Sequence, residues 1–266
     1  MKVVDAAGPA VGSEPAQRRS FVTEIGSLAR IPATFFSTAD VRHGCLVIAV
    51  GSLIACLGPF NATVAFASGG TAIGRVALIV TLGFVGLLCA NRVGLQISPK
   101  GLRHRFLTPL AIGAIVALEI VVVDCFMFRS DLRSDYVTLF RNNDLRFRLL
   151  FFMLGAYAEN IYYRLFLMSA LVWAISLIWR GGNRQPANWV FWAALTITQF
   201  VNAGFNVVAQ IPDPITPVTL AYDALRYICP GLVWGYLYWR HGLVSAEIGA
   251  VGAHPFLQPL LGYLLQ

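Results

Sequence analysis

The stretch Gly155-Ala-Tyr-Ala-Glu-Asn-Ile-Tyr-Tyr-Arg164 places a carboxylate, an amide and a guanidinium inside one long apolar segment. Ionisable groups are costly in a membrane helix unless they are paired or reach water. As a helix of about 1.5 Å per residue, the segment from Phe147 to Trp179 would measure about 48 Å, against a hydrocarbon core of about 30 Å. The sequence therefore predicts a membrane helix that tilts, bends near Gly155 or begins at the membrane surface, with an ionisable site inside it.

The composition supports a membrane protein. Of the 266 residues, 57% are hydrophobic and 12% are charged, whereas a soluble domain carries about 25% charge. The net charge is +7, but no basic patch interleaved with aromatic residues favours nucleic-acid binding. The basic residues are expected to set the topology and to contact anionic lipid headgroups of the bilayer.

Hydropathy predicts an all-α fold, a polytopic transmembrane helical bundle of about seven spans. Residues 1–43 show no sustained periodicity and are expected to form a flexible cytoplasmic tail, so the transmembrane domain covers residues 44–266. The expected spans are Cys45–Ala67, Arg75–Ala90, Leu107–Phe128, Phe147–Trp179, Ala187–Gln210, Val218–Trp239 and Leu243–Leu265.

The distribution of basic residues predicts a cytoplasmic N-terminus. The tail, the loop after the second span and Arg240 would then face the cytoplasm. The linker Arg129–Arg148 would face outward, although basic residues usually face the cytoplasm. It is expected to form an interfacial helix or a salt-bridged loop. Asp124 lies near the end of the third span and is expected at the membrane interface.

Helical spacing assigns the polar groups of the fourth span to different faces. Asn160 and Arg164 are four residues apart and share a face, whereas Glu159 lies about 100° away, in line with Tyr163. We expect Glu159 to face a cavity and Arg164 to face a neighbouring helix. A desolvated glutamate is suited to be a general base toward water, and a structural ion pair between Arg164 and Glu159 or Glu119 is the alternative.

The fifth and seventh spans add amides and one histidine. Asn202 and Asn206 of the fifth span are four residues apart and share a helix face. Two roles are open for these amides: hydrogen bonds between helices, or donation to a developing negative charge. Four residues of the last span fall on one stripe: Glu247, Ala250, His254 and Gln258. Because His254 shares this stripe with polar residues, a catalytic and a structural role are both open.

Two segments resemble motifs of the CPBP family, the CAAX proteases and bacteriocin-processing enzymes also called Abi. Ala-Glu-Asn-Ile-Tyr-Tyr-Arg-Leu-Phe-Leu at 158–167 resembles the EExxxR signature of that family, and Gly-Tyr-Leu-Tyr-Trp-Arg-His-Gly-Leu at 235–243 resembles the lead into its last motif helix. The region around Phe200 and the Pro-rich turn after it fit the FxxxH helix and its loop. The resemblance covers residues 145–260 and implies the all-helical intramembrane fold of that family, like a CAAX protease.

Family members resemble glutamate-type intramembrane endopeptidases, in which the first glutamate of the signature activates water and histidines from two later motifs assist. When the family signature is aligned with this sequence, Glu159 matches the activating glutamate and Arg164 matches the signature arginine. Asn160 replaces the second glutamate.

The two histidine motifs depart from the family pattern. Four residues after Phe200 stands Gly204, where the family has histidine. Eight residues after Gly242 stands Ala250, where many members have the last histidine, and His254 falls where the family places Asn or Asp. If the family motif is shifted by one helical turn along this sequence, His254 matches the motif histidine.

Two functions follow as hypotheses. The first is an intramembrane endopeptidase acting on a membrane peptide, with Glu159 as base, His254 as oxyanion donor or proton shuttle, and Asn206 and Asn160 as supporting donors. The second is a catalytically inactive family member that serves as a subunit or assembly factor of a membrane complex, or that binds a lipid-like ligand. A transporter is a weaker third reading, since no internal repeat is found.

The expected location is the cytoplasmic membrane of a bacterium, as an integral protein. No cofactor is expected. A metal site is not expected either, because only Glu159 and His254 remain as plausible ligands and no spacing motif joins them.

Overall fold

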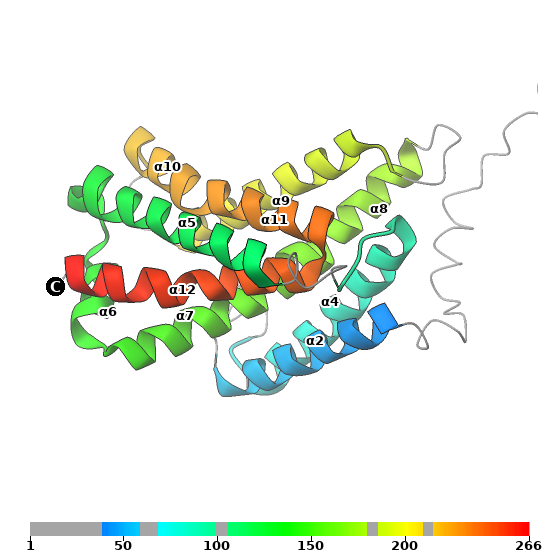
Figure 1. The fold of residues 1–266 in the computed structure, drawn as a ribbon, viewed down its shortest axis with the longest axis horizontal. Helices are drawn as coiled ribbons and strands as arrows, with labels where there is room; N and C mark the ends of the chain where they lie inside the picture. Colours follow the sequence, from blue (N-terminus) through cyan, green and yellow to red (C-terminus); the bar gives the residue numbers. More distant parts are fainter. Residues whose placement is uncertain (1–38, 59–68, 99–105, 180–185, 210–214, 266) are drawn as a thin grey trace, which may run out of the picture.

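The structure is a computed structural model that describes residues 39–58, 69–98, 106–179, 186–209 and 215–265. Within these ranges all regular structure is helical, and Figure 1 shows the helices gathered along one long axis. The elements are α2 (Ala39–Leu57), α4 (Ala72–Val93), α5 (Thr108–Val122), η3 (Val123–Met127), η4 (Arg129–Asp131), α6 (Ser134–Asn142), α7 (Leu145–Glu159), η5 (Asn160–Met168), α8 (Ser169–Ile178), α9 (Asn188–Ala209), α10 (Pro217–Asp223), η6 (Ala224–Ile228), α11 (Cys229–His241) and α12 (Leu243–Leu265).

Five helices are long and apolar enough to cross a membrane. They are Asp40–Leu57, Ala72–Val93, Thr108–Met127, Leu145–Ile178 and Leu243–Leu265. These helices support the predicted helical membrane protein, since only helices and closed barrels satisfy their backbone groups in lipid. The other two predicted spans coincide with α9 and with the run α10, η6 and α11, so the count of seven stays a prediction.

One boundary differs from the expected one. Helix α2 begins at Ala39, before the expected start of the membrane domain at residue 44. Its first turn is attached to the segment after α4, because the Asp40 carboxylate accepts hydrogen bonds from the backbone N–H groups of Ile97 (3.0 Å) and Ser98 (2.8 Å). Residues 1–38 of the predicted tail and residues 59–67 of the first predicted span lie outside the described residues.

The charged linker between the third and fourth spans folds mainly as α6. The exposed pair Arg133–Asp135 marks its start, with Nη2 and Oδ2 2.7 Å apart. Arg148 closes the far end of the linker by donating from Nη1 to the carbonyl oxygens of Phe140 (2.9 Å) and Asn143 (2.7 Å). The linker therefore contains both a helix and an exposed salt bridge, and its position at the membrane interface stays a prediction.

Helix α12 is the centre of the bundle and packs against α5, α7 and α11. Glycine lets α5 and α12 approach closely, because a Cβ atom at Gly113 would lie 2.6 Å from the Gly249 carbonyl oxygen. Helices α2 and α4 form a pair, and α4 packs against η5 and α8. In Figure 1, α6 and the C-terminal end of α12 lie together at the left end of the molecule.

Three π-helical segments lie wholly within the described residues, and each carries an ionisable group. These are η3 with Asp124, η5 with Arg164 and η6 with Arg226. The predicted bend near Gly155 is not found, because α7 continues through this residue and the helix changes geometry only at Asn160. Such π-helical turns occur frequently at functional sites, and here residues of η5 and η6 line one cavity.

Candidate functional site

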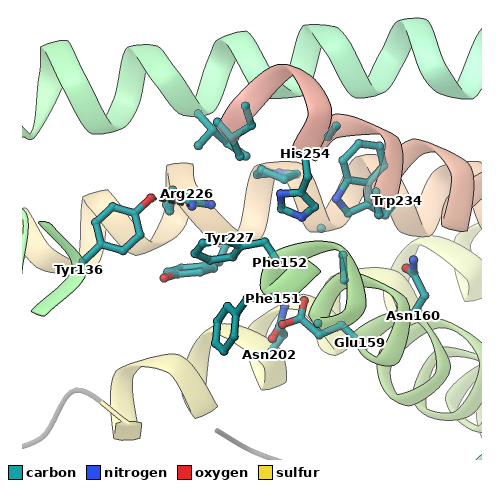
Figure 2. A pocket seen from close by; sticks show the side chains of 18 of the residues that line it. Tyr136, Phe151, Phe152, Glu159, Asn160, Asn202, Arg226, Tyr227, Trp234 and His254 are labelled. Atoms are coloured by element: carbon teal, nitrogen blue, oxygen red, sulfur yellow. Dashed lines mark hydrogen bonds between the residues drawn. The ribbon is translucent and has the colours of Figure 1, made fainter. Parts of the chain in front are cut away.

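A cavity of about 570 Å³ lies between α6 and the middle of the bundle. Its wall is built by α5, α6, α7, η5, α9, α10, η6, α11 and α12, and Figure 2 shows it from close by. Six aromatic residues line it: Tyr136, Phe151, Phe152, Tyr222, Tyr227 and Trp234. Aromatic walls with a few polar groups are typical of ligand sites.

Glu159, the last residue of α7, lines this cavity as the sequence predicted. Asn202 of α9 also lines it, and Figure 2 shows both side chains in the same part of the cavity, beside Phe151. The cavity therefore offers a carboxylate and an amide from two different helices. The side chain of Asn206, the other predicted amide donor on α9, lies outside the described residues.

His254 lines the cavity from α12, but it is held by its neighbours. Its ring stacks on Phe152, with ring centroids 5.8 Å apart and an interplanar angle of 25°, and its Nδ1 lies 3.4 Å from Gln258 Nε2. In the view of Figure 2, the helical turn that carries Phe152 is drawn between His254 and Glu159. Of the predicted stripe on α12, Ala250 lines the same cavity, whereas Glu247 and Gln258 are buried and do not belong to the cavity wall.

Asn160, which stands where the resemblance places a second glutamate, contacts a carboxylate from another helix. Its Nδ2 donates to Glu247 Oε2 over 3.0 Å, and both residues are buried. The Asn160 Oδ1 and Glu247 Oε1 atoms have no hydrogen-bond partner among the described residues. Buried polar atoms without a hydrogen-bond partner are uncommon, and they mark a site where a further hydrogen bond can form.

Arg164 does not face away from the cavity as the helical spacing predicted. It is only 3% exposed, and it lines the cavity together with Asn160. The alternative, a structural ion pair with Glu159 or Glu119, stays a prediction. The α-helical spacing failed here because η5 is π-helical, which changes the direction of each side chain after Asn160.

Asp124 is fully buried inside the protein, at the end of the third predicted span. Its predicted position at the membrane interface stays a prediction. Asp124 accepts hydrogen bonds from the hydroxyl groups of Tyr136 (2.9 Å) and Tyr222 (3.2 Å), and it pairs with Arg226 Nε at 3.2 Å. Burial raises the pKa of Tyr136 well above its usual value, so this hydroxyl stays protonated and donates to Asp124.

Three members of this cluster, Tyr136, Tyr222 and Arg226, line the cavity and were missed as site residues. A signal was present in the sequence: Asp124 and Arg226 lie toward the same end of two predicted spans and carry opposite charges. Because isolated charges are costly inside the membrane, such a pair is a candidate contact. Spacing within one helix does not reveal it.

The family pattern around Phe200 does not describe the cavity. Phe200 is 63% exposed, and the position of Gly204, where the family has histidine, faces open space. The face of α9 turned inward carries Gln199 and Asn202, both buried. A histidine at position 204 would therefore point away from Glu159.

No group of three or more His, Cys, Asp or Glu side chains suited to hold a metal ion occurs within the described ranges. The ionisable residues of the cavity instead come from separate helices. Comparisons with protein-family models, with curated proteins and with solved structures found no match to this chain.

Proposed function

We propose that the cavity binds a lipid-like, amphipathic ligand, and that the protein is a CPBP-like membrane protein without peptidase activity. The observation that carries this proposal is the aromatic cavity of about 570 Å³, in which Phe152 stacks on His254. A histidine that is stacked on one side and contacts Gln258 is poorly placed to assist water attack. The same cavity suits a ligand with an apolar part and a polar head.

The walls divide into an apolar and a polar part. Phe151, Phe152, Trp234 and Leu257 supply aromatic and aliphatic surface. Glu159, Asn160 and Asn202 supply a carboxylate and two amides at the level where α7 meets η5. A lipid-like molecule would place its head against the polar groups and its chain against the apolar ones, because burying unpaired polar groups in lipid is costly.

Filling the cavity is expected to remove the ligand. Ala250 lies in the cavity wall and is buried, so Ala250→Phe places a ring where the ligand would lie. We expect the full chain, purified in a mild detergent, to carry a co-purifying lipid-like molecule in native mass spectra. The Ala250→Phe variant should retain less than about a tenth of it, a loss that corresponds to about 1.4 kcal/mol of binding energy.

The matched control is Ala111→Phe on α5, where the native residue is exposed on the surface of the bundle. This variant should keep the ligand at the wild-type level. Equal occupancy in all three proteins, or no bound molecule in the wild type, would contradict the proposal.

Hydrolysis is the second candidate, favoured by a different observation: Glu159, Asn202 and His254 all line the same cavity. In this case Glu159 would take a proton from water and Asn202 would donate to the developing oxyanion. The proposal requires a membrane peptide to enter from the end of the bundle that carries α6.

The substitution Glu159→Gln tests this second candidate. If hydrolysis occurs, membrane peptide fragments that depend on the wild-type chain should fall about 10²–10⁴-fold in the variant, because a general base is lost. New peptide termini are measured by mass spectrometry of membranes from cells that express either protein. Glu119→Gln, the same change at a residue outside the cavity wall, is the control, and unchanged fragments in Glu159→Gln would exclude hydrolysis by Glu159.

A further inference from the structure

Two buried oxygen atoms without a hydrogen-bond donor belong to residues that already contact each other. Asn160 of η5 is fully buried, and Glu247 of α12 is 6% exposed. Asn160 Nδ2 donates to Glu247 Oε2 over 3.0 Å. The second oxygen of each pair of atoms, Asn160 Oδ1 and Glu247 Oε1, has no hydrogen-bond partner among the described residues. The contact therefore leaves two acceptor atoms without a donor.

An ionised Glu247 does not account for these two atoms. A carboxylate only accepts hydrogen bonds, so it cannot satisfy the Asn160 oxygen. It would also keep a charged oxygen buried without a donor, which costs far more than burying a neutral group. The direct partner of the carboxyl group is an uncharged amide, and an amide does not balance a buried negative charge.

A protonated Glu247 accounts for both atoms with a single proton. A neutral carboxyl group has one O–H donor and one C=O acceptor, which complement the oxygen and the N–H group of an amide. We propose that Glu247 and Asn160 hold one proton between them as a neutral acid–amide pair, and that this proton exchanges with water through the cavity. The C=O oxygen then accepts from Asn160 Nδ2, and the O–H group donates to Asn160 Oδ1.

The route through the cavity follows from the neighbours of Glu247. Asn160 lines the cavity, as does Ala250, which lies about one turn beyond Glu247 on α12, whereas Glu247 itself does not belong to the wall. Figure 2 shows Asn160 among the side chains that line the cavity. Ionisable groups inside membrane helices often mark proton pathways. Here the amide of Asn160 separates the acid from the cavity.

Two titratable groups on the packed helices lie within electrostatic range of Glu247. They are Tyr157 of α7 and Arg164 of η5. The Tyr157 hydroxyl donates to the carbonyl oxygen of Val47 over 3.1 Å. Arg164 is the cation that opposes the neutral form of the acid, yet Glu247 Oε1 receives no donor from it. A measurement of the protonation state of Glu247 is therefore decisive.

Infrared spectroscopy of the full chain in a mild detergent at neutral pH measures this state. A protonated carboxyl group has a C=O stretching band apart from the bands of carboxylates, and the band moves to lower wavenumber in D₂O. We expect this band in the wild type and its loss in Glu247→Gln. Glutamine keeps one donor and one acceptor, so the variant should fold. Asp131→Asn, the same change at an exposed residue, should leave the band unchanged.

The substitution Asn160→Leu tests the shared hydrogen bonds. The C=O band of Glu247 should move to higher wavenumber, because a hydrogen bond to the oxygen weakens the C=O bond and this bond is lost. The wild-type band should be the same in KCl and in NaCl. Three results would overturn the inference: no band that depends on Glu247, an unshifted band in Asn160→Leu, or a band lost in NaCl, which would assign the two oxygens to a sodium ion.

The time course of the shift in D₂O tests the route of exchange. Ala250→Phe fills the cavity beside Glu247, and overpacking of this kind should slow the exchange about tenfold. Ala111→Phe, at an exposed position of α5, should exchange at the wild-type rate. Equal rates in Ala250→Phe and the wild type would overturn exchange through the cavity. The band itself does not depend on a bound molecule, so this inference and the proposed ligand can fail separately.

Discussion

Replacing Asp124 by leucine is expected to destabilise the protein by about 3–5 kcal/mol, because Arg226 would stay buried without its carboxylate. The Asp124 side chain is fully buried and that of Arg226 is 12% exposed. Little water can therefore solvate the Arg226 guanidinium once the carboxylate is removed. The same substitution also removes the acceptor of Tyr136 and Tyr222. The loss should appear as a lower thermal unfolding midpoint in detergent.

A second substitution separates the ion pair from simple damage to packing. Adding Arg226→Met to Asp124→Leu removes both charges and should recover part of the lost stability, since apolar replacements of a buried pair are often tolerated. The control is Arg133→Met, which breaks the exposed pair with Asp135 and should cost about 0–1 kcal/mol. If the double variant is no more stable than Asp124→Leu, the unpaired charge of Arg226 is not the cause of the lost stability.

Any side chain at Gly86 is expected to force α4 away from η5. A Cβ atom there would lie 2.6 Å from the carbonyl carbon of Leu165 and 2.7 Å from the Cα atom of Phe166, in contact also with the Leu165 oxygen. These are backbone atoms, so no change of rotamer relieves the clash. Gly86→Ala should therefore cost about 1–3 kcal/mol, the range for overpacking, and should reduce the yield of folded protein.

Gly204→Ala is the matched control for Gly86→Ala, because a Cβ atom at Gly204 meets no neighbour and the residue lies in helix α9. We expect the control to unfold at or slightly above the wild-type temperature, since alanine is the better helix former. The yield of monomeric protein and the unfolding midpoint in detergent decide the comparison. If Gly86→Ala behaves like Gly204→Ala, the close contact of α4 with η5 is not required.

The helices themselves were largely predictable from hydropathy. The apolar segment around Glu159 was expected at 147–179, and the structure has a helix long and apolar enough to cross a membrane at Leu145–Ile178. The stripe on α12 was also predictable, because its spacing of three and four residues is that of a regular helix. Local periodicity is sufficient where a helix keeps α geometry.

The site was predictable only in part. Glu159 was expected to face a cavity, and it does. Arg164 was misplaced because the helix becomes π-helical at Asn160, and hydropathy carries no signal for that change. The burial of Asp124 was not predicted because it depends on Arg226 and on Tyr136, residues that are 102 and 12 positions away in the chain.

The sequence by itself determined that this is an all-helical membrane protein with ionisable groups inside its helices, since both properties follow from composition and spacing along one segment. Only the tertiary structure decided which of those groups meet. Asn160 contacts Glu247, Asp124 pairs with Arg226, and His254 stacks on Phe152 because separate helices pack against each other at these points. Contacts of this kind depend on the relative rotation and depth of helices, which no single helix encodes.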